Sequence, residues 1–191
     1  MTSSNWIIIS NALAIAATMY FGVSSGAQNK HRTWSAFFFA CSTAFTFKAL
    51  SQLFSRLNTP EFWILLSCAV GAASFLLLTA CTCLTRPQWK WLQWLWPLMG
   101  LAGVLVGGIF APLPGAYLLT IVVICILLSV FLLSGASSAS IRSWMYAGFI
   151  LCGVGWLARH LFTFDGILNP ASTFDWFELS GIFCLWQGAK R

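Results

Sequence analysis

The chain has 191 residues, of which 59% are hydrophobic and 7% are charged, and its formal net charge is +6. With a mean hydropathy of +0.84, it lies far outside the range of soluble globular proteins, in which about a quarter of the residues are charged. The composition excludes a soluble domain, and because the basic residues flank apolar segments, it also argues against nucleic acid as a partner.

Seven apolar segments follow one another along the chain, each near the roughly 20 residues that a membrane-spanning helix needs. They cover residues 6–23, 34–54, 62–84, 92–110, 115–133, 141–162 and 173–186. The connections are short and carry helix breakers such as Pro60, Pro87 and Pro170. We therefore predict an all-α membrane protein, a bundle of seven transmembrane helices in which residues 1–191 form one domain.

Polar residues are few within the first four segments. Asn11 lies in the first segment, and Lys48 lies in the second, about six residues or ~9 Å from its end, with Gln52 one turn beyond. In the fourth segment, Gly103 and Gly107 form a Gly-x-x-x-Gly pair. Because small residues let helices approach closely in lipid, the pair predicts packing within the bundle or, as an alternative, a helix-mediated dimer or a membrane partner.

The last two segments hold the remaining charges of the apolar spans. Arg159 and His160 end the sixth segment, and Asp175 and Glu178 lie near the start of the seventh. Glu178 stands about five residues inside its segment, close to the depth of Lys48. Because a charged side chain inside a membrane is costly and usually faces a partner in the bundle, we predict an ion pair between Lys48 and Glu178.

The basic residues are sorted by side of the membrane. Seven of the ten share one side, namely Lys30, Arg32, Arg86, Lys90, Arg142, Lys190 and Arg191. The other three, Lys48, Arg56 and Arg159, lie on the side that holds all four acids. Positively charged loops face the cytoplasm, so we predict that the amino terminus is outside and the carboxyl terminus is cytoplasmic. An odd number of spans requires such opposite ends.

The outer ends of the predicted helices gather a polar constellation. Its members are Asn11, Lys48 and Glu178 at one depth, with Gln52, Asp175, Arg159 and His160 around the mouth. Intramembrane ionisable residues are candidates for functional sites. We therefore predict an outward-opening polar pocket that binds a small amphiphile or lipid. The alternative is that Lys48 and Glu178 only fasten the second helix to the seventh, while the outer charges reach water.

Catalytic and metal-binding motifs are not indicated. The two histidines, His31 and His160, are too few for a three-histidine zinc site. Haem would need axial ligands deep in the bundle, where the sequence has none. The seven cysteines lie within or at the ends of apolar segments and have no paired spacing, so no disulfide framework is expected. We predict no cofactor, no metal site and no catalytic residue.

Two segments resemble a known family. Lys48-Ala49-Leu50-Ser51-Gln52 in the second segment and Asp175-Trp176-Phe177-Glu178 in the last make the layout similar to the CREST superfamily of seven-helix membrane hydrolases, which includes alkaline ceramidases and adiponectin and progestin receptors. That family binds zinc through a Ser and a His on the second helix and a pair of His on the last. Here Lys48, Gln52 and Glu178 stand at those places. The resemblance implies a relative that has lost the zinc chemistry, and the departure argues against amide hydrolysis.

The sequence as a whole predicts a non-enzymatic multi-pass protein of the prokaryotic inner membrane, in contact with membrane lipids and a small amphiphilic ligand. Two alternatives remain. One is a hydrolase of the resembling superfamily with an altered metal site, and the other is a scaffold or accessory subunit of a membrane complex.

Overall fold

The computed structural model describes residues 3–27, 32–54, 60–110, 114–136, 138–161 and 170–190. Within these ranges the chain forms seven α-helices and no strand, as the sequence predicts, and each helix ends within three residues of its predicted bounds. The helices are α1 (Ser3–Gly26), α2 (Arg32–Leu53), α3 (Pro60–Thr85), α4 (Lys90–Phe110), α5 (Pro114–Ser134), α6 (Ala139–Leu161) and α7 (Pro170–Ala189).

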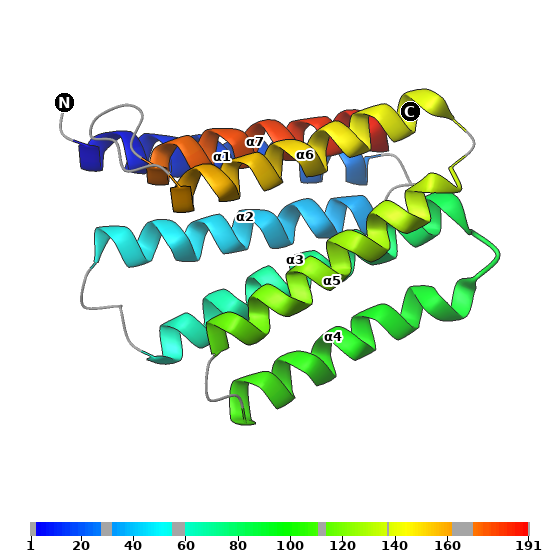
Figure 1. The fold of residues 1–191 in the computed structure, drawn as a ribbon, viewed down its shortest axis with the longest axis horizontal. Coiled ribbons are helices and arrows are strands. Elements are labelled where there is room, and N and C mark those ends of the chain that lie inside the picture. The colour runs from blue at the N-terminus through cyan, green and yellow to red at the C-terminus, as the bar shows by residue number, and fades with distance from the viewer. Residues whose placement is uncertain are drawn as a thin grey trace.

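Successive helices run in alternating directions, so that α1 begins at one end of the bundle and α7 ends at the other (Figure 1). α2 packs against α1 on one side and α3 on the other, and α3 in turn contacts α4 and α5. α6 packs along α7, and α7 also lies against α1. The first and last helices described here are therefore neighbours, which brings α1, α2 and α7 together around one site.

Aromatic side chains fix the register of these three helices. Phe21 of α1 stacks on Trp186 of α7 with ring centroids 4.6 Å apart, and its edge meets Phe38 of α2 at 5.8 Å. The indole Nε1 of Trp186 also donates a hydrogen bond to Ser24 Oγ at 3.0 Å. Phe21, Phe38 and Trp186 are all buried, and large buried aromatics supply much of the apolar area that holds helices together.

Glycines bring α6 and α7 into backbone contact. A Cβ atom added to Gly148 of α6 would lie 2.8 Å from the carbonyl oxygen of Gly181, and one added to Gly181 of α7 would lie 2.7 Å from the carbonyl oxygen of Gly148. Such separations are shorter than real carbon–oxygen contacts, so neither position accepts a larger residue without moving a helix. The close approach fixes the position of α7 and of the side chains it presents to α1 and α2.

Two of the described helices are long and apolar enough to cross a membrane, over Ile8–Gly26 in α1 and Ile64–Thr85 in α3. Basic residues gather at the end of the bundle where α7 ends. Arg32 starts α2, Arg86 follows α3, Lys90 starts α4, Arg142 lies in the first turn of α6, and Lys190 follows α7. The described acidic side chains, Asp175 and Glu178, lie toward the other end of α7.

Candidate functional site

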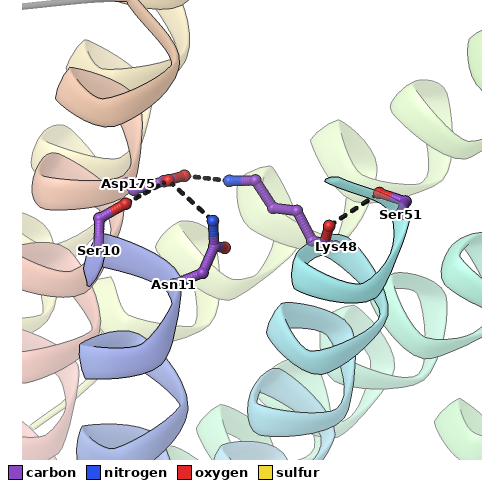
Figure 2. Close-up of polar contacts among 5 residues, drawn as sticks. All are labelled: Ser10, Asn11, Lys48, Ser51 and Asp175. Atoms are coloured by element: carbon purple, nitrogen blue, oxygen red, sulfur yellow. Dashed lines mark hydrogen bonds and ion pairs between the residues drawn. The ribbon is translucent and has the colours of Figure 1, made fainter. Parts of the chain in front are cut away.

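The carboxylate of Asp175 is the centre of a polar cluster between α1, α2 and α7 (Figure 2). Its Oδ1 forms a salt bridge with Lys48 Nζ of α2. Its Oδ2 accepts hydrogen bonds from Ser10 Oγ at 2.8 Å and Asn11 Nδ2 at 3.4 Å, both from α1. The Asp175 residue is only 1% exposed. A buried carboxylate is tolerated where charged and polar donors surround it in this way.

The salt bridge that the structure shows for Lys48 is made with Asp175, whereas the partner predicted from the sequence is Glu178. The difference comes from the start of the last helix, which was predicted at residue 173 and lies at Pro170. Proline suits the first turn of a helix because its missing N–H needs no partner there. With the earlier start, the residue five positions into α7 is Asp175, which matches the depth of Lys48, five positions before the end of α2.

Ser10 is a member of the cluster that the sequence analysis did not single out. Several buried hydroxyls in this fold donate to a carbonyl one turn earlier in their own helix, such as Ser74 to Val70 and Ser129 to Cys125. Serine in a helix commonly makes this local bond. The Ser10 hydroxyl donates to a side chain of another helix, Asp175 of α7. The signal in the sequence is the polar pair Ser10-Asn11 inside an apolar run. Of this pair, only Asn11 was predicted as a site residue.

Lys48 connects the buried cluster to the surface. Its side chain is 16% exposed, while the side chain of Asp175 is fully buried. The ammonium also lies 5.8 Å from the ring centroid of Phe45, one turn earlier on α2, and a cation over an aromatic face is stabilised by the ring quadrupole. The long aliphatic stem thus crosses apolar surroundings and leaves its charged end at the edge of the cluster.

Glu178 lies one turn further along α7, in a different environment. Its carboxylate interacts electrostatically with the thiols of Cys41 in α2 and Cys152 in α6. The Cys152 thiol donates a long contact of 3.9 Å to the Glu178 carbonyl oxygen. Glu178 is partly buried. It therefore faces the junction of α2, α6 and α7, whereas Asp175 faces that of α1, α2 and α7.

The remaining predicted site residues are placed only by their backbone. Gln52 lies in the last turn of α2, and Arg159 and His160 lie in the last turn of α6. Their side chains fall outside the described part of the structure, as do the surroundings of Gly103 and Gly107 in α4. The predicted contributions of these five residues to a pocket mouth or a partner surface stay predictions.

An open apolar groove of about 350 Å³ runs between α1 and α7. It is lined by Ala17, Phe21, Leu179, Ser180, Phe183 and Cys184. Ser10, Ala17 and Phe21 lie on one face of α1, because residues seven and four apart share a face. Leu179 follows Asp175 by one turn of α7, about 6 Å, and Ala17 follows Ser10 by two turns, about 10 Å. The groove therefore begins one to two helical turns from the polar cluster and extends toward the carboxyl-terminal ends of α1 and α7.

The cluster does not suit a zinc ion. Zinc takes imidazole, thiolate or carboxylate ligands, whereas Lys48 offers only donors and Ser10 and Asn11 are weak ligands. Among the side chains that the structure describes, no three of the types His, Cys, Asp and Glu lie close enough together to hold a metal ion. The chemistry that the cluster can perform is ion pairing and hydrogen bonding.

Comparison of the chain with protein-family models, with curated proteins and with solved structures finds no match in any of the three.

Proposed function

We propose that the chain is a seven-span membrane protein with its amino terminus outside and its carboxyl terminus in the cytoplasm. All seven helices have 20 to 26 residues, and 20 residues of helix reach about 30 Å, the thickness of a bilayer's hydrocarbon core. The gathering of basic residues at one end of the bundle supports the orientation. The short connections suit the inner membrane of a prokaryote, which we take as the host membrane.

Within that bundle, we propose that α1, α2 and α7 bind a small amphiphile. The observation that carries the proposal is a buried polar cluster that lies one to two helical turns from an apolar groove on the same pair of helices, α1 and α7. An amphiphile has the same division into a polar head and an apolar tail. The groove volume, about 350 Å³, falls in the roughly 300–1,000 Å³ range of small-molecule sites.

The charges of the cluster indicate the kind of head group. Lys48 and Asp175 neutralise each other, and Ser10 and Asn11 add neutral polar groups. A strongly anionic or cationic head would have to break the ion pair in a poorly solvated place, which is costly. A neutral head with hydroxyl groups can instead exchange hydrogen bonds with the cluster at the exposed edge of Lys48. A monoacylglycerol has this chemistry and a single tail.

Binding of monooleoylglycerol to the purified protein, followed by native mass spectrometry, tests the proposal. Ala17→Phe fills the groove, and Ala16→Phe is its matched control, because Ala16 is exposed and does not line the groove. If the ring displaces two CH₂ groups of the tail, affinity falls about tenfold or more. We expect this loss for A17F and not for A16F. Equal affinity in both variants and the native protein would contradict tail binding in the groove.

A second candidate function follows from the contacts of Asp175, which has a salt bridge and two hydrogen bonds within the protein. In this reading Lys48 and Asp175 fasten α2 to α7 in a scaffold or accessory subunit. The double variant K48M/D175L separates the two functions. If it folds and binds monooleoylglycerol as the native protein does, the cluster is a fastener. If it folds and loses binding, the cluster contacts the head group.

The hydrolase alternative has its own measurement, which is elemental analysis of the purified protein. Stoichiometric zinc would revive the resemblance to the CREST superfamily with an altered ligand set, and zinc-free, monooleoylglycerol-binding protein would support amphiphile binding without hydrolysis.

A further inference from the structure

Two arginines converge on the turn between α5 and α6, at the end of the bundle opposite the amino terminus. Nη1 of Arg142 donates a hydrogen bond of 2.5 Å to the carbonyl oxygen of Ala136. The guanidinium of Arg86, which follows α3, lies against the preceding residue, since a Cβ atom added to Gly135 would stand 3.1 Å from its Nη2. Adjacent residues of one turn thus hold two positive charges from different helices.

Among the described side chains, no carboxylate forms a salt bridge with either guanidinium group. The four acids of the chain are Glu61, Asp165, Asp175 and Glu178. Glu61 lies in the first turn of α3, Asp165 falls between α6 and α7 in the sequence, and the other two lie in the first half of α7. The positions of Glu61, Asp175 and Glu178, which lie in described helices, belong to the opposite end of the bundle. Among the described side chains, the one salt bridge is that of Lys48 with Asp175.

Like charges held together without a counter-charge attract an anion. A guanidinium has five N–H donors in a planar fork that matches the oxygens of a phosphate. Arg142 uses a donor on the turn, and both side chains keep others. The Arg86 guanidinium also lies 5.5 Å from the ring centroid of Trp89, so its plane is supported while its edge remains available. Arg86 and Trp89 are both exposed.

An exposed apolar stripe leads along α5 to the same place. Leu127 and Phe131 are 63% and 74% exposed and lie four residues apart on one face of the helix, and Gly135 follows the end of α5. A free phosphate ion would leave this stripe uncovered. The phosphate of a phospholipid would bring acyl chains that cover it. The position of the arginines at the top of an apolar face therefore favours a lipid over a soluble anion.

We infer that Arg86 and Arg142 form a binding site for the phosphate group of an anionic phospholipid. The inference rests on the membrane location in the proposed function, but not on amphiphile binding between α1 and α7. Basic pockets between helices at the cytoplasmic side of membrane proteins commonly hold anionic head groups. The lipid phosphate would offset one of the two positive charges and bridge the end of α3 to the beginning of α6.

The test uses the full chain in nanodiscs that contain phosphatidylglycerol and phosphatidylcholine, with bound lipid counted by native mass spectrometry. We expect a preference for phosphatidylglycerol that falls about fivefold in R86Q or R142Q and about thirtyfold in the double variant, as for one basic contact each. The control is R32Q/K190Q, which removes the same charge from the same end of the bundle. R86K/R142K keeps the charge and loses the fork, so it should retain part of the preference.

An equal loss in R32Q/K190Q would overturn the inference, because it would show attraction to the charged end as a whole. An unchanged preference in the double variant would overturn it as well. Inorganic phosphate is added as a competitor, and displacement of phosphatidylglycerol at comparable concentrations would assign the site to a soluble anion instead.

If R86Q/R142Q fails to fold, R86K/R142K decides. Full retention of the phosphatidylglycerol preference by R86K/R142K would contradict recognition by the guanidinium fork. Failure of this test would leave the proposed amphiphile groove between α1 and α7 untouched, because monooleoylglycerol binding to A17F tests that groove separately.

Discussion

The ammonium group of Lys48 in α2 forms a salt bridge with the buried carboxylate of Asp175 in α7, across 127 positions of the sequence. Both α2 and α7 pack against α1, which adds Ser10 and Asn11 to the same carboxylate. The pair therefore joins three helices at one point. Its energetic and functional consequences can be separated by substitution.

Removal of one partner should destabilise the protein more than removal of both. Asp175→Asn leaves the lysine charge without its counter-charge, and breaking a buried pair costs about 3–5 kcal/mol. Because Lys48 is 16% exposed, we expect the lower end of that range. K48M/D175L replaces the pair with apolar side chains and should recover part of the loss, because it removes the uncompensated charge but also the acceptor of the Ser10 and Asn11 hydrogen bonds. Thermal unfolding in detergent micelles measures both. Equal destabilisation by the single and double variants would show that the charges are not coupled.

The hydrogen bond from Ser10 should contribute more than an ordinary buried serine. Ser10→Ala removes a 2.8 Å bond to a carboxylate on another helix, and bonds to charged groups are worth about 1.5–3 kcal/mol. The matched control is Ser74→Ala, whose hydroxyl donates only to Val70 of its own helix and whose loss we expect to be near neutral. Chemical denaturation of the two variants compares them. A loss in S74A as large as in S10A would contradict the assigned role of the bond.

The backbone contact between α6 and α7 predicts a strong difference between two glycines of α6. Gly148→Ala places a methyl group 2.8 Å from the carbonyl oxygen of Gly181, so the helices must separate, at about 1–3 kcal/mol or more. Gly153→Ala meets no atom within 4 Å and should stabilise the helix by up to about 1 kcal/mol. The melting temperatures should therefore shift in opposite directions. A tolerated G148A would mean that α6 and α7 can move apart freely.

The proposed topology predicts where reporters function. A reporter that is active only in the cytoplasm should be active when it is fused to the carboxyl terminus and inactive when it is fused to the amino terminus. Both fusions are expressed in a bacterial inner membrane. The reason is the odd number of spans combined with the basic residues at the end of the bundle where α7 ends. Two termini on the same side would contradict seven spans. Opposite termini with the reverse activities would contradict the orientation alone.

The helices were predictable because each apolar segment is long and is bounded by breakers, and the periodicity of such segments does not depend on distant contacts. The site was predictable in part. Lys48, Asn11 and Asp175 stood out as polar residues in apolar runs, and the structure brings them together. The choice between Asp175 and Glu178 required a helix start accurate to one turn, and Pro170 was the signal for it.

Other parts of the structure depend on packing that a single sequence does not show. The participation of Ser10 follows from the neighbouring position of α1 and α7, since the same residue type at Ser74 bonds only within its own helix. The Gly148–Gly181 contact was not predicted, because these two glycines lie on different helices and form no Gly-x-x-x-Gly pair like that of α4. Contacts between helices far apart in the sequence depend on how the helices are rotated and ordered, which local patterns leave open.

The 127-residue separation of Lys48 and Asp175 also has a consequence for biogenesis. The ribosome makes α2 well before α7, and at ~5–20 residues per second the interval is roughly 6–25 s. During that time Lys48 has neither its carboxylate nor the completed contact with α7, so the nascent bundle carries a charge that its final structure neutralises. Arrival of α7 supplies the carboxylate that pairs with Lys48 and completes the contacts among α1, α2 and α7.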